Sequence, residues 1–295
     1  MKRVLITGAN SYIGKSFEKY VLDHYSSELS IDTIDMIDGS WKTKDFSVYD
    51  VVFHVAGIAH VDVGNVIDED KAKYFAVNTS LAIDTCKKAK AEGVKQFVFM
   101  SSASIYGDSS PCGKRKHITK DTEPVPTTLY GESKLLADQG VRTLEDDSFT
   151  VTVLRPPMIY GKSCKGNYPS LAKLAKKLII FPRIDNERSM LYIDNLCEFL
   201  SKIMINCKGG VYWPQNAEYT RTSDMVKYIA EIHNHKIFVS KIWNWVVGLA
   251  RIIPGKPKKL ANKAFGNFTY DQSMSKYDFD YIVADLNTSI ERTEE

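Results

Sequence analysis

The sequence has few cysteines, and they form no recognisable motif. Five of its 295 residues are cysteines, and no two of them lie in a C-x-x-C pair. This odd, scattered set predicts neither a disulfide framework nor a zinc site, so we expect no bound metal. Free thiols are typical of a reducing compartment, and we therefore expect a cytoplasmic protein.

A large excess of charge of one sign is also missing. The chain carries 39 Lys and Arg residues against 36 Asp and Glu residues, which leaves a net charge of +3. Proteins that bind nucleic acid by neutralising many phosphates carry a much larger positive excess. Nucleic acid is therefore not an expected partner.

Long hydrophobic runs are absent too. Residues 3–7 are too few for the apolar core of a signal peptide, and they predict a first strand. The most apolar segment, 242–253, has about twelve residues, whereas a membrane-spanning helix needs about twenty. We expect it to bury its apolar face, with Arg251 and the following lysines (Lys256, Lys258, Lys259 and Lys263) solvated. The alternative is a membrane-surface segment whose Trp and Ile side chains insert beside anionic lipid.

What the chain does contain is an alternation of short strands and longer helices. Apolar runs predict strands at 3–7, 31–36, 51–55, 96–101 and 149–154, and helical patterns lie at 12–23, 68–92 and 131–145. Continuously apolar strands are typical of a parallel sheet covered on both faces. The sequence thus predicts an α/β fold with a doubly wound, Rossmann-type parallel sheet.

The pattern becomes irregular after Gly161. Helices are predicted at 168–177, 194–206, 223–234 and 242–252, and no long linker separates the two halves. We expect a dinucleotide-binding domain over 1–161. A smaller substrate-binding lobe would cover 162–295, with some of its elements returning to the core.

A glycine-containing turn follows the first strand, and its sequence is TGANSYIG over 7–14. Gly8 permits a tight turn, and Gly14 lets the next helix pack closely on the strand. A pyrophosphate could bind the free N–H groups at the helix start, so the candidate cofactor residues here are Gly8, Asn10, Ser11, Tyr12, Ile13 and Gly14. Ser11 stands where a glycine is usual, and its hydroxyl could contact phosphate. An ordinary strand-to-helix turn is the alternative.

A dinucleotide site also needs an acidic residue at the end of the second strand. Asp32, Asp35 and Asp38 compete for this role, and we choose Asp35, which lies 21 residues after Gly14. Residues 32–41 contain no Arg or Lys that could pair with a 2′-phosphate. This favours NAD as the cofactor, with NADP possible.

Three residue types with complementary chemistry occur in order. Ser102 ends a predicted strand, and Tyr130 and Lys134 are four positions apart, on one face of a helix. A free tyrosine has a pKa of about 10, and we expect the nearby ammonium to lower it toward neutrality. Tyr130 would exchange a proton with a sugar oxygen as a hydride moves to or from the cofactor, and Ser102 would hold that oxygen. A surface tyrosine beside a lysine is the alternative.

Together with HVAG at 54–57, AVNT at 76–79, SSASIYG at 101–107 and LRPPMIYG at 154–161, these motifs resemble the extended short-chain dehydrogenase/reductases of the NAD-dependent epimerase/dehydratase family. The resemblance covers about residues 1 to 200. It implies that Ser102, Tyr130 and Lys134 are catalytic and that Asn78 supports the active-site water network. It also implies cofactor contacts from Ala56, Gly57, Lys134 and Pro157, and a homodimer.

The same resemblance implies a substrate. Arg188, in NERSMLYIDNL, resembles the residue that clamps a UDP pyrophosphate, although an exposed surface arginine is the alternative. Asn167 is a candidate for the nucleotide, and Ser102, Ser104 and Tyr130 are candidates for the sugar. We therefore expect a UDP-sugar substrate.

The type of reaction stays open between two candidates. Met158 stands where 4-epimerases of UDP-galactose have asparagine, and GNYPSL at 166–171 and FGNFTY at 265–270 resemble 4-ketosugar reductases of capsule and O-antigen biosynthesis. We expect a 4-epimerase or 4-ketosugar reductase that acts at C4 of a UDP-hexose for a surface polysaccharide. The alternative is a non-catalytic, Rossmann-type nucleotide sensor.

Overall fold

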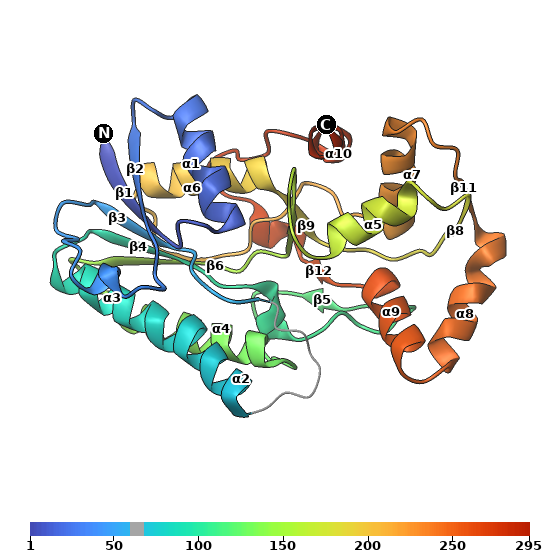
Figure 1. The fold of residues 1–295 in the computed structure, drawn as a ribbon, viewed down its shortest axis with the longest axis horizontal. Helices are drawn as coiled ribbons and strands as arrows, with labels where there is room; N and C mark the ends of the chain where they lie inside the picture. Colours follow the sequence, from blue (N-terminus) through green and yellow to red (C-terminus); the bar gives the residue numbers. More distant parts are fainter. Residues whose placement is uncertain (60–67) are drawn as a thin grey trace.

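A six-stranded parallel sheet forms the centre of the computed structural model, which describes residues 1–59 and 68–295 (Figure 1). Its order is β10-β6-β4-β3-β1-β2, and every neighbouring pair is parallel. The strands are β1 (Lys2–Thr7), β2 (Leu29–Ile34), β3 (Val51–His54), β4 (Gln96–Met100), β6 (Thr150–Leu154) and β10 (Gly210–Tyr212). The predicted fold class is confirmed, and the second strand lies two residues earlier than predicted.

Helices cover both faces of this sheet because its strands are apolar on both sides (Figure 1). Val4 and Ile6 pack in one core with Phe17 of α1 (Tyr12–His24), while Leu5 packs in the other with Ala82 of α3 (Leu81–Ala91). Helix α6 (Ile193–Ile205) lies beside α1, and α4 (Leu129–Arg142) lies beside α3. The alternation of strand residues between the two cores fixes the register of each strand.

The strand order reverses between β1 and β3. The chain runs from β1 to its neighbour β2 and then returns to the other side of β1. The connection after β2 contains only a short 3₁₀ turn, η1 (Ser40–Lys42). In open parallel sheets, ligands bind outside the carboxyl ends of the strands at such a reversal. The loops after β1, β3 and β4 therefore define where a site can form.

The helix predicted at 68–92 consists of three pieces. Helix α2 (Asp68–Tyr74) is followed by a π-helical turn, η2 (Phe75–Ser80), and then by α3. A π turn inserts an extra residue into the helical phase, and such turns often occur at functional sites. The sequence pattern did not predict it.

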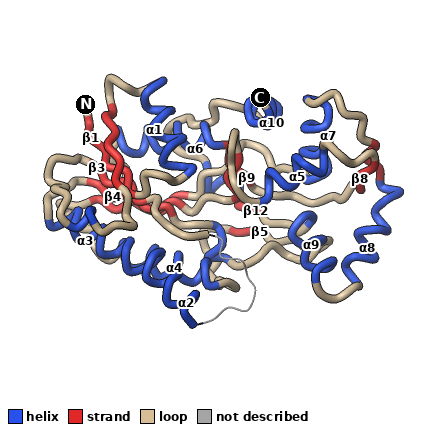
Figure 2. Tube along the Cα trace, in the orientation of Figure 1, coloured by secondary structure: helices blue, strands red, loops and turns tan. Residues whose placement is uncertain are grey.

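Shorter elements build the remainder of the chain (Figure 2). They are η3 (Ala103–Tyr106), β5 (His117–Ile118), β7 (Met158–Tyr160), α5 (Asn167–Ala175), β8 (Ile180–Pro182), β9 (Met190–Tyr192), α7 (Thr222–Ile232), β11 (Phe238–Ser240), η4 (Lys241–Trp243), α8 (Asn244–Ile252), α9 (Lys256–Phe265), β12 (Thr269–Tyr270), η5 (Gln272–Ser275) and α10 (Leu286–Glu294). Strand β10 pairs with β6, so part of the second half returns to the sheet. The division at residue 161 stays a prediction.

The expected burial of segment 242–253 is wrong. Only Val247 of α8 is buried, whereas Trp245 and Leu249 are 58% and 51% exposed. The lysines that follow belong to α9, which packs against α8, and Lys258 and Lys259 are exposed as expected. Over residues 1–59 and 68–295, no helix is long and apolar enough to cross a bilayer.

Candidate active site

The glycine turn brings the loops after β1 and β3 into direct contact. Gly8 has φ of +104°, and a Cβ atom there would lie 2.9 Å from the backbone nitrogen of Ala56. A side chain would therefore be both strained and crowded. Gly8 is required because two backbones approach here, at the reversal of the strand order.

Ser11 caps the first helix. Its Oγ accepts a hydrogen bond of 3.0 Å from the backbone N–H of Gly14, and a Cβ atom at Gly14 would lie only 2.6 Å from that oxygen. The Ser11 hydroxyl thus binds the helix terminus, where we expected it to contact phosphate. The N–H groups of Tyr12 and Ile13 stand in the first turn, where no intrahelical acceptor exists and the helix dipole favours an anion.

The structure distinguishes among the three candidate aspartates. Asn10 donates a hydrogen bond of 3.3 Å to Asp35, which directly follows β2, so both residues stand beside the glycine turn. Asp32 instead accepts hydrogen bonds from Arg3 and Tyr49. Of the three candidates, Asp35 is therefore the aspartate that contacts a residue of the glycine turn.

A second glycine cradle follows β3. A Cβ atom at Gly57 would lie 3.0 Å from Asn78 Oδ1 and 3.3 Å from Lys134 Nζ. The backbone at Ala56 and Gly57, the amide of Asn78 and the ammonium of Lys134 therefore meet at one place. These residues fit a bound dinucleotide. Glycine backbone without side chains, polar donors and a helix N-terminus surround the carboxyl ends of β1 and β3.

Asn78 holds this cradle together. Its Oδ1 accepts from the N–H of Ile58 at 2.9 Å, and its Nδ2 donates to the Ile58 carbonyl and to Ser133 Oγ, both at 3.0 Å. The side chain is fully buried and lies in the π turn η2. In this structure Asn78 ties the loop after β3 to helix α4.

Ser102 and Tyr130 also lie together. Ser102 follows β4, its Oγ donates to Ser104 Oγ at 3.1 Å, and its side chain is close enough to Tyr130 to lower the pKa of that phenol. Tyr130 lies in the first turn of α4, which Thr128 caps through its hydroxyl. A Cβ atom at Gly131 would lie 2.5 Å from the Ser104 carbonyl, so the glycine after the tyrosine lets α4 approach the Ser102 turn.

The expected effect of Lys134 on Tyr130 is not found. Burial raises the pKa of Tyr130, the neighbouring Ser102 hydroxyl partly opposes this, and Lys134 is not among the described groups that shift it. The Lys134 ammonium donates to the Met100 carbonyl at 2.9 Å, and burial lowers the pKa of Lys134 to about 8. The protein by itself therefore keeps Tyr130 protonated at neutral pH, and the predicted lowering of its pKa is wrong for this state.

Two buried groups near the strand ends were not predicted. Arg155 forms a two-point ion pair with Asp138, and both N···O distances are 2.9 Å. His54 is buried in β3, its Nδ1 lies 2.8 Å from Thr7 Oγ1, and burial with the charge of Lys134 lowers its pKa to about 3. No sequence pattern signals contacts between residues so far apart, although HVAG and LRPP contain His54 and Arg155.

The proline loop after β6 closes the site from one side. Pro157 is buried, and the preceding Pro156 carbonyl accepts a hydrogen bond of 2.9 Å from the N–H of Ala103. This bond joins the loop to the turn that contains Ser102. Pro157 therefore lies in a loop that contacts the Ser102 turn, and its contact with the cofactor stays a prediction.

The candidate substrate residues lie on other segments. Arg188 donates to the Lys263 carbonyl at 2.8 Å and to Ser109 Oγ at 2.6 Å, and burial lowers its pKa. Asn167 is the exposed first residue of α5. Within the described part of the chain, no hydrogen bond or ion pair joins either residue to Tyr130.

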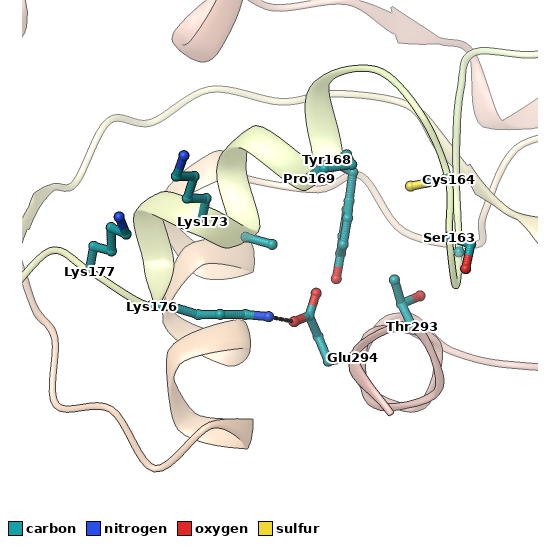
Figure 3. A pocket seen from close by; sticks show the side chains of 11 residues that line it. Ser163, Cys164, Tyr168, Pro169, Lys173, Lys176, Lys177, Thr293 and Glu294 are labelled. Carbon is teal, nitrogen blue, oxygen red and sulfur yellow. Dashed lines mark ion pairs between the residues drawn. The ribbon is translucent and has the colours of Figure 1, made fainter.

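A cavity in the described residues lies elsewhere. It has a volume of about 570 Å³ and lies between α5 and α10, where Tyr168 and Glu294 point toward each other and Lys176 pairs with Glu294 at 2.7 Å (Figure 3). Neither Ser102 nor Tyr130 lines it. The candidate catalytic residues Ser102 and Tyr130 therefore lie away from this cavity.

Two curated relatives resemble this chain along most of its length. A UDP-glucose 4-epimerase of Vibrio cholerae is 28% identical over 253 residues, which cover 78% of this chain and 75% of the relative. An N-acetyl-alpha-D-glucosaminyl-diphospho-ditrans,octacis-undecaprenol 4-epimerase of Escherichia coli O157:H7 is 25% identical over 225 residues, which cover 70% and 64%.

The fold recurs in a solved structure, and a family match covers most of the sequence. A dTDP-4-dehydrorhamnose reductase from Clostridium acetobutylicum has a TM-score of 0.73 at 16% identity, over 99% of this chain and 98% of that one. Residues 4–212 match the NAD dependent epimerase/dehydratase family, and this range contains the glycine turn, Ser102, Tyr130 and Lys134. The resemblance inferred from the motifs is confirmed, and the chain belongs to this family of NAD(P)-dependent nucleotide-sugar epimerases and reductases.

Proposed function

We propose that this protein is a 4-epimerase or 4-ketosugar reductase that acts at C4 of a UDP-linked hexose in surface polysaccharide biosynthesis. One observation carries the proposal. Ser102, Tyr130 and Lys134 gather at the carboxyl ends of β3 and β4, beside the glycine turn and the Gly57 cradle. A nucleotide sensor that only binds would not need a serine and a tyrosine in mutual contact at this edge.

The proposed cofactor residues surround the reversal point of the sheet. Backbone at Gly8, Tyr12 and Ile13 would bind the pyrophosphate of NAD, Asp35 would bind the adenosine ribose, and Lys134 the other ribose. When bound, NAD accepts a hydride from a sugar carbon or returns one. The absence of Arg and Lys from 32–41 supports NAD over NADP.

The proposed proton step uses Tyr130. A protonated phenol beside Ser102 is prepared to give its proton to a ketone oxygen at C4 of the sugar, while the Ser102 hydroxyl holds that oxygen. In the opposite direction, Tyr130 takes the proton of the C4 hydroxyl as the C4 hydrogen leaves with its electron pair. Because burial raises the pKa of Tyr130, the protein's own groups favour the first direction, which is reduction.

Arg188 is the proposed contact to the diphosphate of the substrate, since a planar guanidinium matches phosphate oxygens. The Lys263 carbonyl and Ser109 Oγ accept from two N–H groups of this guanidinium, and its other N–H groups are left for a ligand. Asn167 and Ser104 would complete the substrate side. A second candidate substrate is an N-acetylhexosamine on undecaprenyl diphosphate, because the relative from Escherichia coli acts on such a compound and both substrates are sugar diphosphates.

The test compares Tyr130→Phe with wild type on UDP-hexoses, UDP-4-ketosugars and undecaprenyl diphosphate-linked N-acetylglucosamine. Loss of the proton donor is expected to lower kcat by about 10² to 10⁴. Tyr228→Phe, on α7, is the matched control and should keep full activity. Equal turnover by Tyr130→Phe would refute the mechanism. Tight NAD binding without turnover of any sugar would favour the sensor.

Two further features belong to the proposal. All five cysteines are free thiols, which supports work in the cytoplasm. A homodimer is expected from the family, with α3 and α4 on the outer side of the sheet as the proposed interface (Figure 1). Size-exclusion chromatography with light scattering would measure the assembly state.

A further inference from the structure

The α8–α9 hairpin concentrates positive charge. From residue 236 to residue 270 the chain has seven Lys and Arg residues and no Asp or Glu, while the remaining residues carry a net charge of −4. The small net charge of the whole chain hides this division. One end of the molecule is therefore basic, and the rest is mildly acidic.

The same hairpin exposes an apolar stripe. Trp245, Leu249 and Ile252 follow the i, i+4, i+7 spacing of one helix face, and they are 58%, 51% and 77% exposed. A helix of a globular protein normally turns such a stripe toward the core. Here it faces solvent, because the opposite side, at Val247, is the one that packs inward.

Neighbouring elements extend this apolar surface. Ile242 of η4 and Leu260 of α9 are 71% and 68% exposed. Phe238 of β11 is 63% exposed and pairs in register with Ile180 of β8, which packs against α8 and η4. Contiguous exposed apolar surface of this kind marks an interaction site.

The hairpin is held firmly at the end of the molecule (Figure 1). Ala261 and Phe265 of α9 are buried, and the Asn262 side chain accepts a hydrogen bond of 3.1 Å from the N–H of Cys112. Arg188 bonds to the Lys263 carbonyl on the same helix. The inner side of the hairpin is therefore anchored. On its outer side, the apolar stripe and the exposed Lys258 and Lys259 are unpartnered in the described chain.

We propose that this outer side binds the surface of an anionic lipid bilayer. The side chains of Trp245, Leu249 and Ile252 would enter the interface between headgroups and acyl chains, and Lys258 and Lys259 would meet the lipid phosphates. Indole rings prefer this interface, and clustered lysines are attracted by anionic lipid. Residues 236–270 contain no acidic side chain, and the nearby Asp185 carboxylate pairs with Lys241 at 3.5 Å, so little negative charge is left to repel the lipid. The inference does not depend on the proposed hydride chemistry.

The experiment is co-sedimentation of the full-length protein with vesicles of phosphatidylcholine alone, or of phosphatidylcholine mixed with phosphatidylglycerol. We expect pelleting with the mixed vesicles at low salt, and a decrease of about tenfold in binding at high salt, because salt screens the lysines. Equal pelleting with both vesicle types at low salt, or no pelleting with either, would overturn the proposal.

Two variants separate the apolar and the charged contributions. We expect vesicle binding to fall by about tenfold or more in each of two variants. One is the triple variant Trp245→Ser, Leu249→Ser, Ile252→Ser, and the other is the double variant Lys258→Glu, Lys259→Glu. The matched controls are Leu22→Ser with Val48→Ser and Lys19→Glu with Lys95→Glu, which change exposed residues elsewhere and should bind like wild type.

Thermal unfolding checks that each variant is folded. If both hairpin variants fold and still bind like wild type, the proposal is wrong. A different outcome is that wild type is an oligomer that does not pellet with vesicles, and that the apolar triple variant is a monomer. The face would then be an interface between copies of the chain, and the lipid proposal would be overturned.

Discussion

Asp138 on α4 and Arg155 at the end of β6 form an ion pair in which both residues are buried. Two N···O distances are 2.9 Å, and the Asp138 side chain has no exposed surface. Arg155 also donates to the hydroxyl of Tyr106 at 2.9 Å. The pair therefore ties the helix that carries Tyr130 to the strand that leads into the proline loop.

Asp138→Ala should strongly destabilise the protein. Removal of the carboxylate leaves the Arg155 guanidinium buried and unpaired, which lowers the free energy of unfolding by about 3–5 kcal/mol. Urea denaturation measures this loss. The control is Glu231→Gln, which removes an exposed pair with Lys227 on α7 and should change stability by less than about 1 kcal/mol. Similar effects of the two variants would contradict the importance of the buried pair.

Lys134 should make stability depend on alkaline pH. Its pKa is lowered from 10.5 to about 8, so between these values the unfolded chain binds more protons than the folded one. Stability from this group therefore rises as pH increases from about 8 to about 10.5, by about 3 kcal/mol. Urea denaturation without cofactor, compared between wild type and Lys134→Met over this range, isolates the effect.

The control for this measurement is Lys19→Met, on the exposed side of α1. Its difference from wild type should be independent of pH. A constant difference between wild type and Lys134→Met across the same range would show that Lys134 keeps an ordinary pKa in the folded protein.

Gly131 and Gly248 should respond oppositely to alanine, although both lie inside helices. A Cβ atom at Gly131 would lie 2.5 Å from the Ser104 carbonyl, so Gly131→Ala should cost about 1–3 kcal/mol of stability and lower activity by moving Tyr130. Gly248 has no atom within 4 Å of that position, and Gly248→Ala should stabilise the protein by about 0.4–1 kcal/mol. Thermal unfolding with an activity assay tests both variants. A stability change of the same sign in both would contradict the packing argument.

Asp35 and Asp38 should differ in their effect on NAD. Asp35 stands beside Asn10 at the glycine turn, whereas Asp38 accepts from the N–H of Ser40. Loss of a charged hydrogen bond to a ribose weakens binding by about tenfold to a hundredfold, so Asp35→Asn should raise the Kd for NAD by this factor. Asp38→Asn should leave it unchanged. Isothermal titration calorimetry measures both, and the reverse order would move the ribose to Asp38.

Much of the sheet could be predicted because each strand is visible in its own short stretch of sequence. Continuous apolar runs mark buried parallel strands, and the glycines at 8 and 14 mark the turn between β1 and α1. Tyr130 and Lys134 were placed on one helix by their spacing alone. These features depend on neighbours in sequence, which a single chain displays directly.

Other features depend on distant contacts and could not be predicted. The direction of the Lys134 ammonium, toward the Met100 carbonyl, follows from how α4 packs on β4. The outward stripe of α8 has the same spacing as an inward one, so the pattern alone predicted burial. The ion pair between Asp138 and Arg155 joins elements whose proximity only the folded sheet creates.

The π turn at Phe75–Ser80 sets the angular relation between α2 and α3, and through it the aim of Asn78. Each residue of an α-helix advances the side chains by about 100°. Deleting a single amino acid from this turn would restore regular winding, shift Asn78 within the helix and detach its amide from Ile58. Loss of a residue from this turn would therefore break the hydrogen bonds through which Asn78 connects α4 to the loop after β3.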